Sequence, residues 1–214
     1  MANYSLDSIA ANCYPGTTVL INKFGVRDGD TLSRIEAEIT QEAATRWEQS
    51  PGSSSFDFEH YKAIHKHLFQ DLYSWAGETR DINISKKGTR FCLVEDIPDY
   101  SVRLFLRLRE LDFLRELKRH EFIVEFVDFY VSTNYLHPFR EGNGRTQRLF
   151  LQQLASSTGY ELNFSAIDVD ELMISTIQSA NGVTNGLARI FKKSMKVSEV
   201  LSQDGNRHDT TKTD

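Results

Sequence analysis

Apolar residues recur every three or four positions along most of the chain, a spacing that predicts amphipathic helices rather than strands. Asp30 or Thr31 precedes the first of these stripes and would cap its helix. One or two further helices are expected between residues 165 and 195, with an interruption near 181–186, where asparagine and glycine recur. The spacing therefore predicts an all-α protein, with helices over 32–47, 57–75, 101–119, 121–136 and 145–158.

Residues 81–93 break the helical pattern and predict a short β-hairpin. Ile82 and Ile84 alternate with polar residues, the run 86–89 is typical of a turn, and Phe91 continues a second extended segment. From the residues alone, this could be an ordinary surface hairpin whose lysines keep its edge soluble.

Composition and charge narrow the class of protein. The chain has 214 residues, 40% of them hydrophobic, which is enough for one well-buried core. We expect a single domain over 1–200, with its core at about 55–195, a helical extension at 1–50 and a disordered polar tail at 201–214. The net charge of −5 does not favour nucleic-acid binding.

Location follows from what the sequence lacks. No apolar run approaches the ~20 residues of a membrane span, and the N-terminus lacks the pattern of a signal peptide. Cys13 and Cys92 form no metal or redox motif, and so few cysteines fit a reducing compartment. The histidines at 65 and 67 are two apart and point to different faces, so a metal pair is not expected there. We therefore expect a cytoplasmic protein with no membrane contact.

The run 137–148 is the part of the chain most informative about chemistry. It reads His-Pro-Phe-Arg-Glu-Gly-Asn-Gly-Arg-Thr-Gln-Arg, between two expected helices. Pro138 cannot continue the first helix, which should therefore end near His137, and Phe139 should anchor the loop in the core. The second helix begins at the Gly-Asn-Gly turn, where its first N–H groups lack intrahelical acceptors and the dipole is positive. An anion is the natural ligand of such an end.

The side chains of this run suit a polyphosphate beside a base. The glycines lack a Cβ, so the backbone can approach a phosphate closely. Arg145 and Arg148 share a helix face and can bind the outer phosphates, and Glu141 is a hard oxygen ligand for Mg²⁺. His137 has an ordinary pKa near neutrality and can act as a general base. An ordinary glycine turn between helices remains the simpler alternative, whereas a Walker loop and a dinucleotide fingerprint do not fit the pattern.

The complete run resembles the signature of Fic-domain proteins, His-Pro-Phe-x-Asp/Glu-Gly-Asn-Gly-Arg-x-x-Arg, and fills every specified position. The resemblance extends to residues 75–80, 83–88 and 14–17, and covers the chain from about 12 to about 195. It implies a Fic fold, an all-α helical bundle with the signature loop between two central helices and a short β-hairpin flap.

The resemblance implies protein adenylylation, in which AMP moves from ATP to a Tyr, Thr or Ser hydroxyl of a target protein. His137 would be the general base, and Glu141 would help to hold Mg²⁺ between the α- and β-phosphates. Arg145 would hold the β-phosphate and Arg148 the γ-phosphate. The expected nucleotide-binding residues are Arg140, Glu141, Gly142, Asn143, Gly144, Arg145 and Arg148.

Two further sites are implied by the same resemblance. The hairpin would be the flap, whose edge aligns the target's side chain by main-chain pairing. Gln178 or Asn181 could contact the adenine, without a tight motif in support. The expected flap residues are Ile84, Ser85, Lys86, Lys87 and Gly88.

Many Fic proteins are inhibited by a helix with the pattern Ser/Thr-x-x-x-Glu-Gly/Asn, whose glutamate pairs with the second motif arginine, here Arg148. Residues 32–37 are the nearest N-terminal match, but they have Leu at the first position and Ala at the last. We therefore expect inhibition in trans by a small antitoxin, which would make the chain the toxin of a toxin–antitoxin pair. An unregulated enzyme and some other form of control are the alternatives.

The resemblance also suggests targets, namely the ATPase subunits of the type II topoisomerases DNA gyrase and topoisomerase IV. A branch of the superfamily with Ala-Asn-Lys in its loop phosphorylates its target, and the intact Gly142, Gly144 and Arg145 argue against that branch. Transfer of another group, such as UMP, phosphate or phosphocholine, and a non-catalytic interaction module remain the alternatives.

Overall fold

The computed structural model describes residues 12–50, 54–86 and 89–198, and within these ranges the chain is mostly helical. Two short antiparallel pairs accompany the helices, Ser85–Lys86 (β1) with Thr89–Arg90 (β2) and Tyr160–Leu162 (β3) with Met195–Val197 (β4). The expected all-α architecture with one small hairpin at 81–93 is confirmed. The helices are α2 (Gly29–Gln49), α3 (Phe58–Phe69), α4 (Ile97–Glu110), α5 (Arg119–Leu136), α6 (Asn143–Ser157), α7 (Val169–Ser179) and α8 (Asn185–Ser194).

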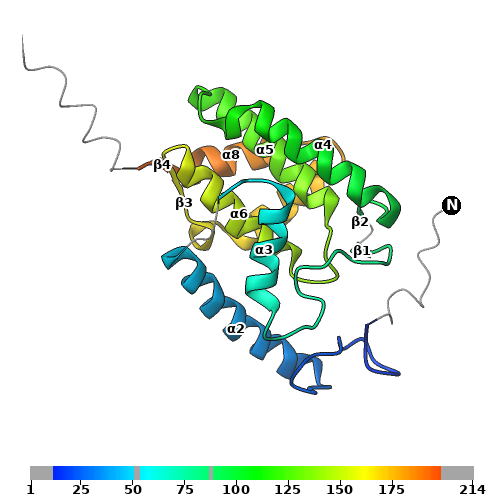
Figure 1. Cartoon of the computed structure of the whole chain (residues 1–214). Helices are drawn as coiled ribbons and strands as arrows, with labels where there is room; N and C mark the ends of the chain where they lie inside the picture. Colours follow the sequence, from blue (N-terminus) through cyan, green and yellow to red (C-terminus); the bar gives the residue numbers. More distant parts are fainter. Residues whose placement is uncertain (1–11, 51–53, 87–88, 199–214) are drawn as a thin grey trace, which may run out of the picture.

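Helices α5 and α6 occupy the centre of the bundle (Figure 1). Helix α5 contacts α4, α6 and α8, whereas α6 also contacts α3 and β3. Their inner faces carry fully buried aromatic side chains, including Phe126 and Phe150, which pack against Phe191 of α8 and Phe105 of α4. Because α5 and α6 are held on several sides, the loop that joins them is fixed by the core rather than by its own sequence.

Helix α2 lies at the outer edge of the bundle, against α3, and the two strand pairs lie at opposite ends (Figure 1). Asp28, rather than Asp30 or Thr31, caps α2, and its side chain accepts a hydrogen bond from the Thr31 N–H at 2.8 Å. Helix α2 covers residues 29–49, which include the apolar stripe at 32–47.

Two helices end earlier than their apolar spacing predicts. Helix α3 ends at Phe69 instead of near residue 75, because the chain turns and buries Leu72 and Tyr73 from a non-helical segment. Helix α4 ends at Glu110 instead of near residue 119, because residues 112–114 adopt positive φ and turn Leu114 into the core. In both places the apolar spacing continues beyond the helix, because the residues that follow it are buried in the core from a turn.

Between residues 165 and 195 the chain forms two helices, α7 and α8, interrupted at 180–184 as expected. The expected tail at 201–214 lies outside the described residues, as do Lys87 and Gly88 of the flap. None of the helices in the described ranges combines the length and the apolar composition that crossing a membrane requires.

Candidate active site

The signature loop joins α5 to α6 through two left-handed residues. His137 follows α5 with φ 40° and ψ 58°, and Gly142 precedes α6 with φ 82° and ψ 2°. Within the described ranges no side chain caps α6, and the N–H groups of residues 143–145 have neither an intrahelical nor a side-chain acceptor, although the N–H of Gly142 just before them donates to Glu141 Oε1. The predicted anion-binding helix end is therefore present as an uncapped, positively polarised terminus.

Gly142 is required by both its conformation and its surroundings. A Cβ at this position would lie 2.3 Å from two ring carbons of Phe69, which is fully buried on α3. Its positive φ also disfavours any residue with a side chain. The loop thus lies directly on the Phe69 ring, and this contact determines how closely the backbone of Gly142 approaches the core.

Asn143 closes the loop through its side chain. Its Oδ1 accepts from the Phe139 N–H at 2.9 Å, and its Nδ2 donates to the Phe139 carbonyl at 2.7 Å. The sequence suggested that Asn143 lines the phosphate site, but here the amide is buried and engaged with the backbone, so only its main-chain N–H remains for an anion. Phe139 is fully buried, as its assignment to the core predicts.

His65 of α3 supports the loop from below. Its Nδ1 accepts from the Gly77 N–H at 2.8 Å, so its Nε2 carries the proton and donates to the Glu141 carbonyl at 3.0 Å. The imidazole stacks on Phe139 with centroids 3.8 Å apart, and burial lowers the pKa of His65 to about 4. His65 is therefore neutral and acts as a fixed link between the Gly77 turn and the loop.

The imidazole of His137 has a defined tautomer. Its Nδ1 lies 3.2 Å from the Asn134 carbonyl, and because a carbonyl can only accept, Nδ1 carries the proton. Nε2 is then the basic nitrogen, which is what a general base requires. The ring stacks on Phe91, with centroids 3.7 Å apart and planes 13° from parallel.

The guanidinium of Arg145 is held by α2. It forms an ion pair with Glu36, lies 3.3 Å from the Thr40 hydroxyl and stacks over the Phe69 ring at 4.8 Å. The second oxygen of Glu36 accepts from the Tyr73 hydroxyl at 2.7 Å. The segment 32–37 lacks the full inhibitory pattern, and its glutamate contacts Arg145 rather than Arg148, the arginine that such a pattern would engage.

Arg148 is oriented differently from Arg145. A Cβ on Gly144 would lie 3.3 Å from its Nη1, so the guanidinium turns back along α6 towards the first turn. Burial lowers the pKa of Arg148, although a guanidinium stays charged at any physiological pH. No acidic side chain in the described ranges forms an ion pair with it. Arg148 therefore offers a positive charge beside the uncapped helix end.

Glu141 fits a role in holding Mg²⁺. Its side chain is 45% exposed, and within the described ranges its hydrogen bond to the Gly142 N–H and its contact with Arg145 both use Oε1. The described residues contain no cluster of three or more acidic, His or Cys side chains that would hold a metal alone. One carboxylate combined with substrate phosphates is a common arrangement for Mg²⁺, and the Oε2 atom of Glu141 suits it.

The remaining predicted residues do not all meet at the N-terminus of α6. Ile84 and Ser85 enter the hairpin, and Lys86 pairs with Thr89. The Arg140 guanidinium lies 3.8 Å from the Cys13 sulfur, beside the N-terminal segment rather than at the helix end. Gln178 and Asn181 are exposed at the C-terminal end of α7, and their contact with an adenine stays a prediction. Three contributing residues escaped prediction as part of the site: Glu36, His65 and Arg80.

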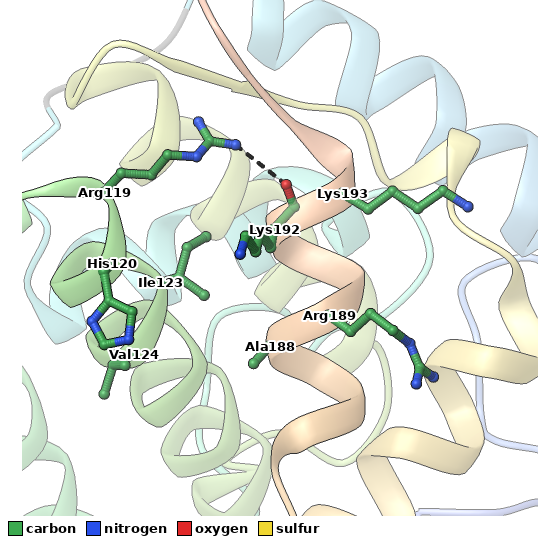
Figure 2. Close-up of a pocket in the computed structure, with 8 residues that line it drawn as sticks. All are labelled: Arg119, His120, Ile123, Val124, Ala188, Arg189, Lys192 and Lys193. Carbon is green, nitrogen blue, oxygen red and sulfur yellow. Dashed lines mark hydrogen bonds between the residues drawn. The ribbon is translucent and has the colours of Figure 1, made fainter.

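A groove of about 760 Å³ lies at the other end of α5, between the N-terminal turn of that helix and α8 (Figure 2). Ile123, Val124 and Ala188 form its apolar part, and Arg119 is tied to the Lys192 carbonyl by a hydrogen bond of 3.2 Å. Because the 18 residues of α5 span about 27 Å, the groove is remote from the signature loop. It belongs to a different surface and contributes nothing to the site.

Comparison with known proteins agrees with this geometry. The sequence profile of the Fic/DOC family matches residues 55–155. A "Probable protein adenylyltransferase y4lH" of Sinorhizobium fredii is 37% identical over 182 residues, 85% of this chain and 93% of the relative. A "Probable protein adenylyltransferase Fic" of Salmonella typhimurium is 34% identical, over 85% of this chain and 90% of the relative.

A solved structure has the same fold. The crystal structure of the BepC protein of Bartonella tribocorum with bound AMPPNP superimposes with a TM-score of 0.80 at 25% identity, covering 88% of this chain and 98% of that one. The geometry of the loop, the profile match and relatives that align over nearly their whole length lead to one conclusion. The chain belongs to the Fic/DOC family.

Proposed function

We propose that this protein adenylyltransferase transfers AMP from ATP to a Tyr, Thr or Ser hydroxyl of a target protein, with release of pyrophosphate. The observation that carries the proposal is the uncapped N-terminus of α6, which follows His137 in the signature loop and has the guanidinium of Arg148 beside its first turn. The names of the relatives and the AMPPNP in the BepC structure support the same activity.

The proposed step is a displacement at the α-phosphorus. His137 Nε2 accepts the proton of the target hydroxyl while its oxygen bonds to the α-phosphorus, and the bond from that phosphorus to the bridging oxygen breaks. The first N–H groups of α6 would bind the phosphate oxygens, and Arg148 would bind the outermost phosphate. The protein thus contributes position and charge, as in other phosphoryl transfers.

Charge balance in the loop supports a requirement for Mg²⁺. Arg145 is paired with Glu36 and lies 3.5 Å from Glu141, whereas Arg148 has no acidic ion-pair partner in the described ranges. The formal charges of these two arginines and two glutamates sum to zero. A polyphosphate brings several negative charges into this neutral site. Mg²⁺, held by Glu141 and phosphate oxygens, would neutralise charge on the α- and β-phosphates.

Inhibition by a separate antitoxin is the finer part of the proposal. Arg148 lies near Tyr130, whose hydroxyl hydrogen-bonds to Thr176 of α7 at 2.8 Å. The outer face of α7 leaves apolar side chains exposed, against which an incoming helix could pack while its glutamate paired with Arg148. These side chains are Val169, Met173, Ile174 and Ile177. The proposed targets remain the ATPase subunits of DNA gyrase and topoisomerase IV.

The test uses purified gyrase and topoisomerase IV ATPase subunits with Mg²⁺ and ATP labelled at either the α- or the γ-phosphate. Label from α-labelled ATP alone should appear on a subunit. His137→Ala should reduce the rate by about 10²–10⁴-fold, the usual contribution of a positioned base. His120→Ala is the matched control, because His120 lies at the remote end of α5.

Three results would each contradict a different part of the proposal. Transfer from γ-labelled ATP would identify a kinase-like reaction instead of adenylylation. Label on other proteins of a bacterial lysate, with none on either topoisomerase subunit, would retain adenylylation and reject the proposed targets. A rate that is unchanged in His137→Ala would reject the assigned base.

A further inference from the structure

Arg80 links the two segments that flank the hairpin to the signature loop, through hydrogen bonds from all three nitrogens of its guanidinium. Nε donates to the His137 carbonyl at 2.9 Å, Nη1 to the Ile82 carbonyl at 2.7 Å and Nη2 to the Cys92 carbonyl at 2.5 Å. Ile82 lies on the segment that enters the hairpin, and Cys92 on the segment that leaves it. One buried side chain, 5% exposed, therefore forms hydrogen bonds to the segments on both sides of the hairpin and to the main chain of His137.

Main-chain hydrogen bonds attach the same segments to the end of α5. The Arg80 N–H donates to the Pro138 carbonyl at 2.8 Å, and the Cys92 N–H donates to the Tyr135 carbonyl at 2.9 Å. The base of the hairpin is thus fixed to residues on both sides of His137. The flap is consequently attached to the loop rather than to the outer surface of the bundle.

The conformation of His137 needs such support. Its φ of 40° places a non-glycine residue in the left-handed region, which persists only where the surrounding structure holds it. Arg80 holds its carbonyl from one side, and Phe91, 6% exposed, provides the flat surface on which its ring stacks. Both contacts come from the flap segments, so the position of the imidazole depends on the flap.

We propose that Arg80 is a positioning residue that fixes the base relative to the flap, so that a hydroxyl presented at the flap meets His137 Nε2. The inference rests on the proposed function. It assigns Arg80 no contact with the nucleotide, because each of the three guanidinium nitrogens donates to one of the carbonyls named above. Loss of Arg80 should therefore impair the transfer step while nucleotide binding persists.

The test compares wild type with Arg80→Lys and Arg80→Ala. Lysine keeps the charge, but its single ammonium cannot reach three separated carbonyls in the geometry of a planar guanidinium. For each folded protein, kcat for transfer to the target should fall about 10–100-fold, the scale expected for a displaced catalytic group, whereas the Kd for MgATP should stay within about threefold. Methylguanidine should partly restore kcat in Arg80→Ala.

Two controls separate positioning from loss of stability. Arg107→Ala removes another arginine that links two segments, since Arg107 pairs with Glu125 and Asp128 on the α4–α5 surface, far from any flap contact in the described ranges. Leu154→Ala opens a cavity in the core and lowers Tm. Both should keep the kcat of wild type at a temperature where they are folded.

A second readout does not depend on transfer activity. The ¹⁵N resonances of His137 should report one tautomer, protonated at Nδ1, in wild type and in both controls. Arg80→Lys and Phe91→Leu should shift these resonances towards a mixture of tautomers. If Arg80→Lys lowers only Tm, with kcat and the His137 resonances unchanged, Arg80 is a structural residue and the inference is wrong. If wild type transfers nothing while the resonances shift as expected, the proposed function fails and the positioning role stands.

Discussion

At the scale of single residues, the shape of the signature loop depends on three uncharged side chains that contact it. Phe69 supports Gly142, the amide of Asn143 closes the turn, and His65 holds the carbonyl of Glu141. None of these contacts involves a charged pair. Packing and neutral hydrogen bonds therefore hold the shape of the loop, which leaves the guanidinium of Arg148 available for the proposed nucleotide.

His65 leads to a prediction about pH. Its pKa is about 4 in the folded protein and about 6.5 in the unfolded chain, so between these values the unfolded chain binds more protons. The free energy of unfolding should then fall as pH is lowered from about 6.5 to about 4, by at most about 1.4 kcal/mol per pH unit from this group.

His65→Gln should remove this contribution, because glutamine does not titrate and can still donate to the Glu141 carbonyl. Urea unfolding at several pH values gives the free energy of unfolding as a function of pH. The contribution of His65 is the difference between the slopes of this dependence in the two proteins. The comparison isolates His65, since His60, whose pKa is also lowered by burial, is present in both. If the free energy of unfolding depends on pH equally in both proteins, His65 is not held neutral in the folded state.

At the scale of elements, α2 is attached to the site by one buried carboxylate. Glu36 binds Arg145 of α6 and Tyr73 of the segment after α3, so three parts of the chain meet at its two oxygens. The same contact keeps the Arg145 guanidinium on the α2 side of the loop. The position of α2 therefore influences how much of that charge a nucleotide can use.

Glu36→Ala should lower the free energy of unfolding by about 1–3 kcal/mol, because it removes the acceptor of the buried Tyr73 hydroxyl and the carboxylate that pairs most closely with Arg145. Guanidinium chloride unfolding measures this change. Glu38→Ala is the matched control, an exposed glutamate on the same helix, and should change the stability by less than about 0.5 kcal/mol. Equal effects of the two substitutions would mean that the ion pair does not attach α2.

At the scale of the whole molecule, electrostatics works against an anionic ligand. The chain carries a formal charge of −5, and the charges of Arg145 and Arg148 are matched by those of Glu36 and Glu141. Neither the protein nor its site attracts free ATP by net charge. The helix end and Arg148 provide local positive potential, and we expect tight binding only when a divalent cation accompanies the nucleotide.

MgATP should consequently raise Tm, whereas ATP with EDTA should have a much smaller effect. At a concentration 100 times Kd, binding should stabilise the folded state by about 2.7 kcal/mol. His137→Ala should keep this shift, because the base does not hold the phosphates, and Arg148→Ala should reduce it. A full shift in EDTA would show that Mg²⁺ is not needed for binding.

The sequence by itself determined the helices and the chemistry of the loop. Helical periodicity is a local property, and the run 137–148 contains the base, the carboxylate, the glycine turn and both arginines within twelve positions. The predicted ends of α3 and α4 were too late in the chain. Leu72 and Leu114 continue the apolar spacing, but they are buried from turns that follow the two helices. The expected contacts of Arg145 and Asn143 with phosphate stay predictions, since in this structure their side chains meet Glu36 and Phe139.

Only the tertiary structure decided which distant residues support the loop. Glu36 meets Arg145 across 109 positions, His65 meets the Glu141 carbonyl across 76, and Arg80 meets the His137 carbonyl across 57. No local spacing encodes such pairs, because they arise from the packing of α2, α3 and the flap segments around the loop. Local sequence therefore specifies which groups can react, and the packed fold specifies where they are held, because orientation depends on contacts that form only when distant segments are buried together.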